Sequence, residues 1–220
     1  MRRIAAVLGA AGLVALSIAA ALARGERPGR FDYYTLVLSW SPTYCASDQG
    51  RDDRQQCGGR RRYDFVVHGL WPQFERGWPE SCPVEDGFVP DRRIDAMLDI
   101  MPSKRLVIHE WRKHGSCSGL GQQGYFDATR ALFSRVRVPA RYITPADTIV
   151  TTPDQLVRDF LSTNRWLGAD AISVQCGNAR DRARLDEIRL CFTKGLEPRP
   201  CGANEHRACR ARQLVMPPVR

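Results

Sequence analysis

Eight cysteines constrain the fold of this 220-residue chain more than any other feature of its sequence. Their number is even, and no two of them form a C-x-x-C pair, the spacing typical of zinc ribbons and thioredoxin-like redox sites. In an oxidising compartment such cysteines pair, so we expect four disulfides. Eight cysteines can pair in about 105 ways, and their spacing alone does not choose among these. The cysteines are Cys45, Cys57, Cys82, Cys117, Cys176, Cys191, Cys201 and Cys209.

The N-terminal segment indicates export. Arg2 and Arg3 precede an almost wholly apolar run over residues 4–22, and Ala21-Leu22-Ala23 resembles a small-residue cleavage site. We interpret residues 1–23 as a secretory signal peptide and residues 24–220 as a single domain. The alternative is a retained membrane anchor, because about 19 apolar residues can span a bilayer. After cleavage we expect no stable membrane association and a periplasmic or secreted location.

The charge balance favours polyanionic partners. Lys and Arg outnumber Asp and Glu by 33 to 24, which gives a net charge of +9 and a pI near 9.5. The expected signal peptide holds two of the arginines and no acid, so the basic character belongs to the remaining chain. Nucleic acid or an anionic surface is the partner that such a chain favours. A hydrophobic share of 43% excludes a disordered chain.

Local patterns predict an α+β fold with a central antiparallel sheet packed with several helices. Runs rich in β-branched and aromatic residues predict strands over 31–40, 63–70, 172–175 and 185–192. Apolar side chains at helical spacing predict helices over 91–101, from Ser103 to Gly115, over 125–138 and from Thr152 to about Trp166. Residues 48–62 and 73–88 are expected to be loops, and residues 214–220 a loose terminus.

Three of the four histidines lie in two short blocks. The first block, FVVHGLWPQ, spans residues 65–73, and its His68 ends an apolar strand. The second block, IHEWRKHGSC, spans residues 108–117 and contains His109 and His114. Histidine is the side chain that titrates, unperturbed, in the neutral range, so this concentration of imidazoles indicates acid–base chemistry. The fourth, His206, lies in a polar tail where we expect a surface role.

The second block predicts a compact catalytic cluster if it is a helix. Residues four apart share a helix face, so His109 would lie over Lys113, and Glu110 over His114. Lys113 is one of only three lysines in the chain. Cations balance the phosphoryl oxygens of a phosphate transition state, while a neutral imidazole or a carboxylate takes protons. His68 acting as the acid and a base in this helix could lie on opposite sides of one phosphodiester.

The second block has two other interpretations, a zinc site and a purely structural role. A zinc protease motif, H-E-x-x-H, needs histidines four apart, but here the spacing is H-E-x-x-x-H. The fifth position is turned about 140° around a helix, so a shared metal is awkward. A purely structural role in the core would suit a single histidine better than three with an adjacent Lys and Glu.

The two blocks resemble the paired active-site segments of the ribonuclease T2 family, secreted acid endoribonucleases. Residues 36–45, LVLSWSPTYC, resemble that family's first strand. The resemblance covers about residues 31–118 by motif and the later cysteines by pattern. It implies a secreted enzyme that cleaves single-stranded RNA by metal-independent transphosphorylation. The short signal segment and the arginine-rich composition indicate a bacterial source. The products would carry a 2′,3′-cyclic phosphate.

The resemblance also implies residue roles. His68 would be the general acid for the leaving 5′-oxygen, and His114 the general base for the 2′-hydroxyl. Glu110 and Lys113 would stabilise the transition state, and His109 would hold the phosphate. The base would be bound by Trp71, Gln73 and Phe74. Several family members carry an acidic residue or Asn at the position of Gln73, so the base preference is left open.

Further expectations follow from the same resemblance. It implies the disulfides Cys45–Cys57, Cys82–Cys117, Cys176–Cys209 and Cys191–Cys201. It implies no metal or other cofactor, because the nucleophile belongs to the RNA substrate. We expect a monomer. The rival hypothesis is a secreted basic RNA-binding or toxin-like protein that keeps the fold without turnover. The Arg60–Arg62 run and the arginines from Arg180 to Arg189 could contact phosphates, or could simply be solvated surface.

Overall fold

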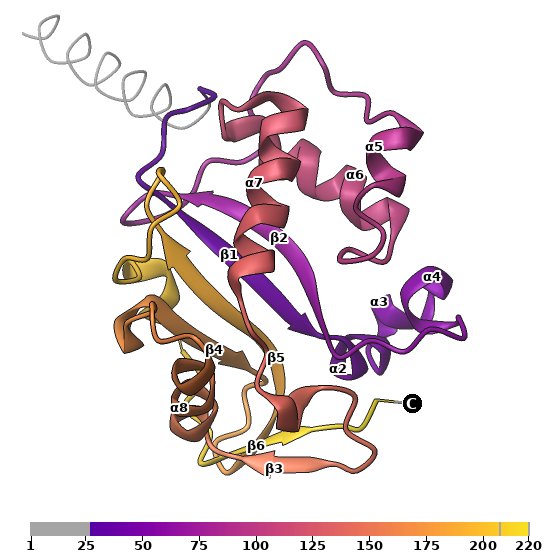
Figure 1. Cartoon of the computed structure of the whole chain (residues 1–220), viewed down its shortest axis with the longest axis vertical. Helices are drawn as coiled ribbons and strands as arrows, with labels where there is room; N and C mark the ends of the chain where they lie inside the picture. The colour runs from indigo at the N-terminus through magenta and orange to yellow at the C-terminus, as the bar shows by residue number, and fades with distance from the viewer. Residues whose placement is uncertain (1–26, 207, 220) are drawn as a thin grey trace, which may run out of the picture.

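The structure is a computed structural model that describes residues 27–206 and 208–219 (Figure 1). The expected signal peptide, residues 1–23, lies outside the described residues. The strands are β1 (Tyr33–Trp40), β2 (Phe65–Gln73), β3 (Ile149–Thr151), β4 (Ile172–Cys176), β5 (Arg182–Phe192) and β6 (Gln213–Met216). The α-helices are α2 (Ser41–Cys45), α3 (Asp48–Arg51), α4 (Arg54–Cys57), α5 (Asp91–Asp95), α6 (Lys104–Lys113), α7 (Gly121–Arg135) and α8 (Pro153–Thr163). Short 3₁₀ turns are η1 (Gly115–Cys117), η2 (Ala140–Tyr142), η3 (Ala169–Ala171) and η4 (Ala203–His206).

The described strands form one sheet in the order β2-β1-β5-β6-β3, with β4 paired to β5. Every pair is antiparallel except β5 with β6, which is parallel. The predicted α+β class is confirmed, and the sheet is mixed rather than wholly antiparallel. Strand β5 is long enough for its first residues to pair with β6 and its last residues to pair with β1.

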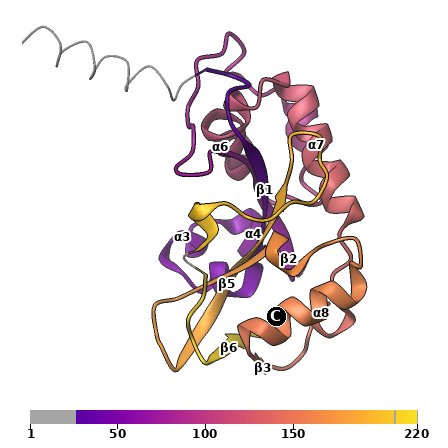
Figure 2. The same ribbon diagram turned by 90° about the vertical axis from the view of Figure 1, so that its left-hand side faces the viewer.

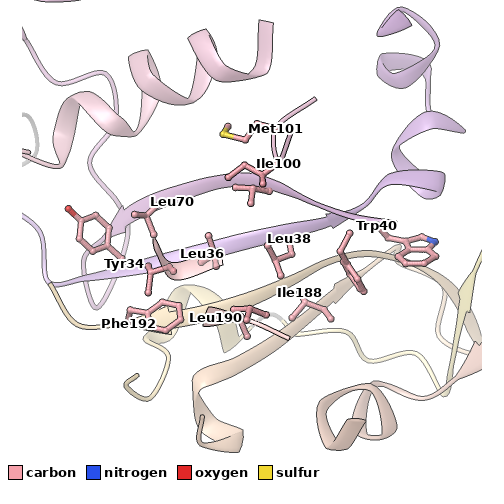
Figure 3. Close-up of a cluster of buried hydrophobic side chains, with 14 of the residues drawn as sticks. Tyr34, Leu36, Leu38, Trp40, Leu70, Ile100, Met101, Ile188, Leu190 and Phe192 are labelled. Atoms are coloured by element: carbon pink, nitrogen blue, oxygen red, sulfur yellow. The ribbon is translucent and has the colours of Figure 1, made fainter. Parts of the chain in front are cut away.

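One face of the sheet builds the hydrophobic core. Leu36 pairs with Leu190 and Leu38 with Ile188, so these apolar side chains alternate onto the same face (Figure 3). All four are fully buried. Full burial of such a side chain contributes about 1.5–3 kcal/mol each. Helices α7 and α8 lie along the same side of the sheet and add apolar residues to the cluster (Figure 2).

The opposite face of the same strands carries polar residues. In the register of β1 and β5, Ser39 pairs with Glu187 and Val37 with Arg189, one residue out of phase with the core pairs. Between β1 and β2 the register passes from Val37–Gly69 to Leu38–Val67. His68 is therefore the extra residue of a β-bulge, a feature that re-aims a side chain beside a functional site.

Several element boundaries differ from those predicted. Strand β2 continues through Pro72 to Gln73, because β2 is an edge strand where a missing backbone N–H is tolerated. The loose terminus predicted from residue 214 is wrong for residues 214–216. They belong to β6, where Leu214 and Met216 are fully buried. The predicted loop 48–62 contains α3 and α4.

Four disulfides hold the loops to these elements. They join Cys45 to Cys57, Cys82 to Cys117, Cys176 to Cys209 and Cys191 to Cys201, the pairs that the resemblance implies. Cys117 lies in η1, directly after α6, so its disulfide ties the end of that helix to the loop that follows β2. Within residues 27–206 and 208–219, the helices are too short or too polar to cross a bilayer.

Candidate active site

The bulge in β2 presents His68 to two carboxyl groups. Its Nδ1 lies 2.7 Å from Glu187 Oε1 on β5, and its Nε2 lies 3.5 Å from Glu110 Oε1 on α6. The His68 side chain is 32% exposed, whereas that of Glu110 is fully buried. An imidazole between two carboxylates is favoured in its cationic form.

Helix α6 supplies the other predicted catalytic groups. The helix ends at Lys113, and the backbone N–H of His114 donates to the carbonyl of Glu110, as the predicted four-residue spacing requires. His114 is 5% exposed and His109 is exposed. The ammonium of Lys113 lies 3.7 Å from Glu80 Oε2 in the loop after β2. The predicted positions on α6 therefore split into a buried pair, Glu110 and His114, and two residues open to solvent.

Trp71 is the side chain that joins the two histidines. Its ring centroid lies 5.1 Å from that of His68, edge to face, and 4.9 Å from that of His114, in a stacked arrangement. The distance between the centroids of the two imidazoles therefore cannot exceed the sum of these two distances. The indole Nε1 donates a 2.7 Å hydrogen bond to Glu110 Oε2. Strand β2 and helix α6 contact each other at this point.

The two imidazoles have opposite shifts of pKa. Burial lowers the pKa of His68, but its hydrogen bond to Glu187 and the charges of Glu110 and Glu187 outweigh burial and raise it above the ordinary value. Burial and the charge of Lys113 lower the pKa of His114 to about 2. His68 therefore keeps its proton to higher pH than a free imidazole does, and His114 stays neutral over the same range, which is the division expected of an acid and a base.

Glu110 and His109 are perturbed as well. Burial raises the pKa of Glu110 to about 7, against the lowering effects of His68 and the Trp71 hydrogen bond. Partial burial and the charge of Lys113 lower the pKa of His109. Two buried atoms of this cluster, Glu110 Oε1 and His114 Nδ1, have no hydrogen-bond partner among the described residues. Unsatisfied buried polar atoms are rare in folded proteins and are typical of sites that bind a further group.

Two hollows meet at His109. The larger, about 650 Å³, is lined by His68, His109 and Glu187 together with hydroxyl and amide groups, among them Ser39, Tyr44 and Gln56. The smaller, about 340 Å³, lies along the outer side of α6 and is lined by Ser81, Arg105, Ile108, His109, Arg112 and Lys113. The first offers hydroxyl and amide groups together with the carboxylates of Asp53, Asp186 and Glu187, and the second offers positive charge, with Arg105 lining both.

The residues predicted to bind a base are not gathered at either hollow. Gln73 is 3% exposed, and its Oε1 accepts a 2.8 Å hydrogen bond from Asn204. Phe74 is partly buried against the core. The ring of Trp71 lies against His114, with the Arg189 guanidinium 5.0 Å from its centroid. Base stacking on Trp71 stays a prediction, and it requires one of these neighbours to move aside.

Sequence reasoning missed Glu187, and it named Arg189 only as a possible phosphate contact. Glu187 accepts two hydrogen bonds at Oε2 from Arg189, at 2.9 and 3.1 Å, in addition to its contact with His68. The available signal was a pair of charged residues alternating with Ile188 and Leu190 in a predicted strand. Such alternation is ordinary for a half-exposed strand, so the sequence alone did not single out these two residues.

Comparison with known proteins finds ribonucleases. The model of the ribonuclease T2 family matches residues 31–201. A ribonuclease of Aeromonas hydrophila is 43% identical over 124 residues, covering 54% of this chain and 52% of that protein. A probable ribonuclease of Haemophilus influenzae is 31% identical over 182 residues, covering 77% of this chain and 61% of that protein. The matches thus span about half to three-fifths of these relatives' own lengths.

Solved structures share the fold. An RNase-related protein from Calystegia sepium superposes with a TM-score of 0.67 at 23% identity, covering 85% of this chain and 97% of that one. RNase NT in complex with 5′-AMP superposes with a TM-score of 0.56 at 25% identity, covering 78% of this chain and 95% of that one.

Proposed function

Because the chain belongs to the ribonuclease T2 family, we propose that it is an exported endoribonuclease that cleaves single-stranded RNA by metal-independent transphosphorylation. One observation carries this proposal. Two imidazoles from different elements lie against the same indole, and the pKa of one is raised while that of the other is lowered. Groups whose environments push their pKa values apart are assigned as acid and base.

In this proposal His114 is the general base and His68 the general acid. Neutral His114 removes the proton of the 2′-hydroxyl, and the 2′-oxygen attacks the adjacent phosphorus. The bond from phosphorus to the 5′-oxygen breaks, and the cationic His68 gives that oxygen the proton held on Nε2. The products are a 2′,3′-cyclic phosphate and a free 5′-hydroxyl. The nucleophile comes from the substrate, so the step needs no metal-bound water. DNA lacks this hydroxyl and would not be cut.

Glu110 acts on the phosphoryl oxygens. With its pKa raised to about 7, it is a neutral carboxylic acid in mildly acidic solution and donates a hydrogen bond instead of repelling the anion. Trp71 occupies Oε2, which leaves the unpartnered Oε1 for the substrate. Lys113, 40% exposed, turns from Glu80 to add positive charge, and His109 holds the phosphate at the border of the two hollows.

The RNA strand crosses α6 at His109. The larger hollow reaches His68 and presents hydroxyl and amide groups suited to the edges of a nucleobase. The smaller hollow presents Arg105 and Arg112, which suit a phosphate next to the one being cleaved. This path puts the scissile phosphate beside His68 and His109 and uses the basic character of the chain for the backbone.

The test is incubation of the purified monomeric protein with total RNA and with a single dinucleotide in the presence of EDTA. The proposal predicts smearing of the RNA and cyclic-phosphate ends that ³¹P NMR identifies. RNA that is retained in a gel-shift assay but never cut would contradict turnover and favour the binding protein. Cleavage that EDTA abolishes and zinc restores would contradict the metal-independent mechanism.

A further inference from the structure

Strand β5 places a carboxylate and a guanidinium next to the catalytic bulge. Glu187 and Arg189 are two residues apart, so both side chains project on the face opposite the core, beside Ser39 and Val37 of β1. Strand β1 separates β5 from β2, and the His68 imidazole reaches across it. Ser39, which pairs with Glu187, is small enough to leave this crossing open.

The contacts fix both oxygens of Glu187. Its Oε1 accepts from His68 Nδ1 at 2.7 Å, and its Oε2 accepts from both Nε and Nη2 of Arg189. The Glu187 side chain is 13% exposed and that of Arg189 is 22% exposed. A largely buried carboxylate is tolerated when it is paired and hydrogen-bonded, and here it meets a cation on each side. Its pKa is lowered, because the His68 and Arg189 contacts outweigh burial.

An ionised carboxylate only accepts hydrogen bonds, so the proton between it and His68 resides on Nδ1. This fixes the tautomer and leaves Nε2, which faces Glu110 Oε1, as the nitrogen that gains and loses the transferred proton. We propose that Glu187 is a positioning residue that holds the His68 imidazole with Nε2 aimed at the leaving oxygen, while Arg189 fixes Glu187 in turn. This inference rests on the proposed function and assigns no contact with RNA to either residue.

Arg189 adds a link to the other half of the site. Its guanidinium lies 5.0 Å from the centroid of Trp71, the ring that stacks on His114. Guanidinium groups over an indole are attracted by its π face. Arg189 therefore hydrogen-bonds to Glu187, the partner of the His68 acid, and packs on Trp71, the ring that supports the His114 base. These contacts keep the two imidazoles in one arrangement.

The charge of Glu187 also sets the proton affinity of His68. Carboxylates from two elements face the ring, Glu187 on β5 and Glu110 on α6, and the charge of Arg189 on β5 opposes them. Removing the charge of Glu187 leaves burial and Arg189 opposed only by Glu110, which is itself largely neutral below pH 7, so the pKa of His68 falls. The alkaline limb of the pH–rate profile then moves to lower pH.

The experiment compares Glu187→Gln with wild type on two substrates. One is a dinucleotide, whose 5′-oxygen needs a proton to leave, and the other is a nucleoside 3′-(p-nitrophenyl phosphate), whose leaving group needs none. We expect kcat on the dinucleotide to fall about 10- to 100-fold, as for other carboxylates that orient a histidine, with KM nearly unchanged. The loss should shrink to within about threefold on the activated substrate. Glu197→Gln, a surface carboxylate paired with Arg135, is the matched control and should behave as wild type.

The outcomes separate this inference from the proposed function. Wild type that cleaves neither substrate would overturn both proposals. If wild type is active, two results would overturn only the positioning role. One is a Glu187→Gln variant as active as wild type, and the other is a variant that loses the same activity on both substrates and keeps the wild-type alkaline limb. Should Glu187→Gln fail to fold by circular dichroism, Glu187→Asp keeps the charge on a shorter side chain. It should lower kcat on the dinucleotide more than on the activated substrate, because the shorter side chain holds the His68 imidazole less well, and an equal loss on both substrates would refute the inference.

Discussion

A methyl group at Gly69 displaces the catalytic carboxyl of Glu110 while leaving every catalytic side chain chemically unchanged. Gly69 lies in β2 between His68 and Trp71 and pairs with Val37 of β1. A Cβ built at Gly69 would overlap Glu110 Oε2 and lie 2.7 Å from Trp71 Nε1. These two atoms now form a 2.7 Å hydrogen bond directly over the backbone of Gly69. In Gly69→Ala they would have to separate.

The magnitude follows from two costs. Forcing an extra carbon into a packed site costs about 1–3 kcal/mol. Losing a hydrogen bond to a buried carboxyl group costs about 1.5–3 kcal/mol. Partial relaxation leaves an expected loss of about 2–5 kcal/mol in the free energy of unfolding, which lowers Tm by about 5–15 °C in a domain of this size. Displacing Glu110 and the indole by about 1 Å should also lower kcat by about 10²-fold.

The assay is thermal unfolding by circular dichroism together with dinucleotide cleavage below the Tm of the variant. Gly177→Ala is the matched control, because a Cβ at Gly177 meets nothing within 4 Å. The control should unfold and cleave as wild type does. A Gly69→Ala protein with wild-type Tm and kcat would show that the contact of Trp71 with Glu110 does not depend on this glycine.

Further predictions concern the charged groups themselves. His68→Phe and His114→Phe should each lower kcat by about 10²–10⁴-fold or more while the protein stays folded, and near-full turnover by either variant would refute its role. EDTA should leave dinucleotide cleavage unchanged, and rescue of a lost activity by added zinc would contradict this. The pH–rate profile should be a broad bell. The alkaline limb lies above the ordinary pKa of 6.5, where His68 loses its proton, and the acidic limb lies near the lowered pKa of His114, about 2. An alkaline limb below pH 6.5, or an acidic limb near that pH, would count against this assignment of the histidine pair. Glu110→Gln should lose activity yet unfold at a higher temperature than wild type above pH 7. The pKa of Glu110 is raised from 4.5 to about 7 in the folded protein. The contribution of this group to the free energy of unfolding of wild type is therefore fully present at low pH and is lost as the pH rises through 7. Thermal unfolding from pH 5 to pH 8 measures this, and parallel Tm curves for the two proteins would exclude it.

Local sequence was enough for the elements that carry the catalytic groups. A helix was predicted from Ser103 to Gly115, which puts His109, Glu110, Lys113 and His114 close together, and α6 ends at Lys113 with His114 hydrogen-bonded to its last turn. Short motifs encode such contacts because helix neighbours lie three and four residues apart. The α+β class likewise followed from the segregation of strand and helix patterns.

Local sequence patterns do not predict which residues far apart in the chain come into contact. Glu187 lies 119 residues from His68, and only the strand order β2-β1-β5 brings them together. Strand β6 is a four-residue run before two prolines, and it exists because β5 offers a parallel partner. The bulge at His68 depends on the register of two strands, which no pattern within one strand reveals.

The most direct measurement is a histidine-resolved NMR titration of the intact protein, with His68→Phe and His114→Phe used to assign the resonances. The account predicts that His114 stays neutral down to the lowest pH at which the protein is folded, while His68 takes up its proton above pH 6.5. Both rings titrating together near pH 6.5 would contradict it, because neither imidazole would then be prepared for its part in moving the proton.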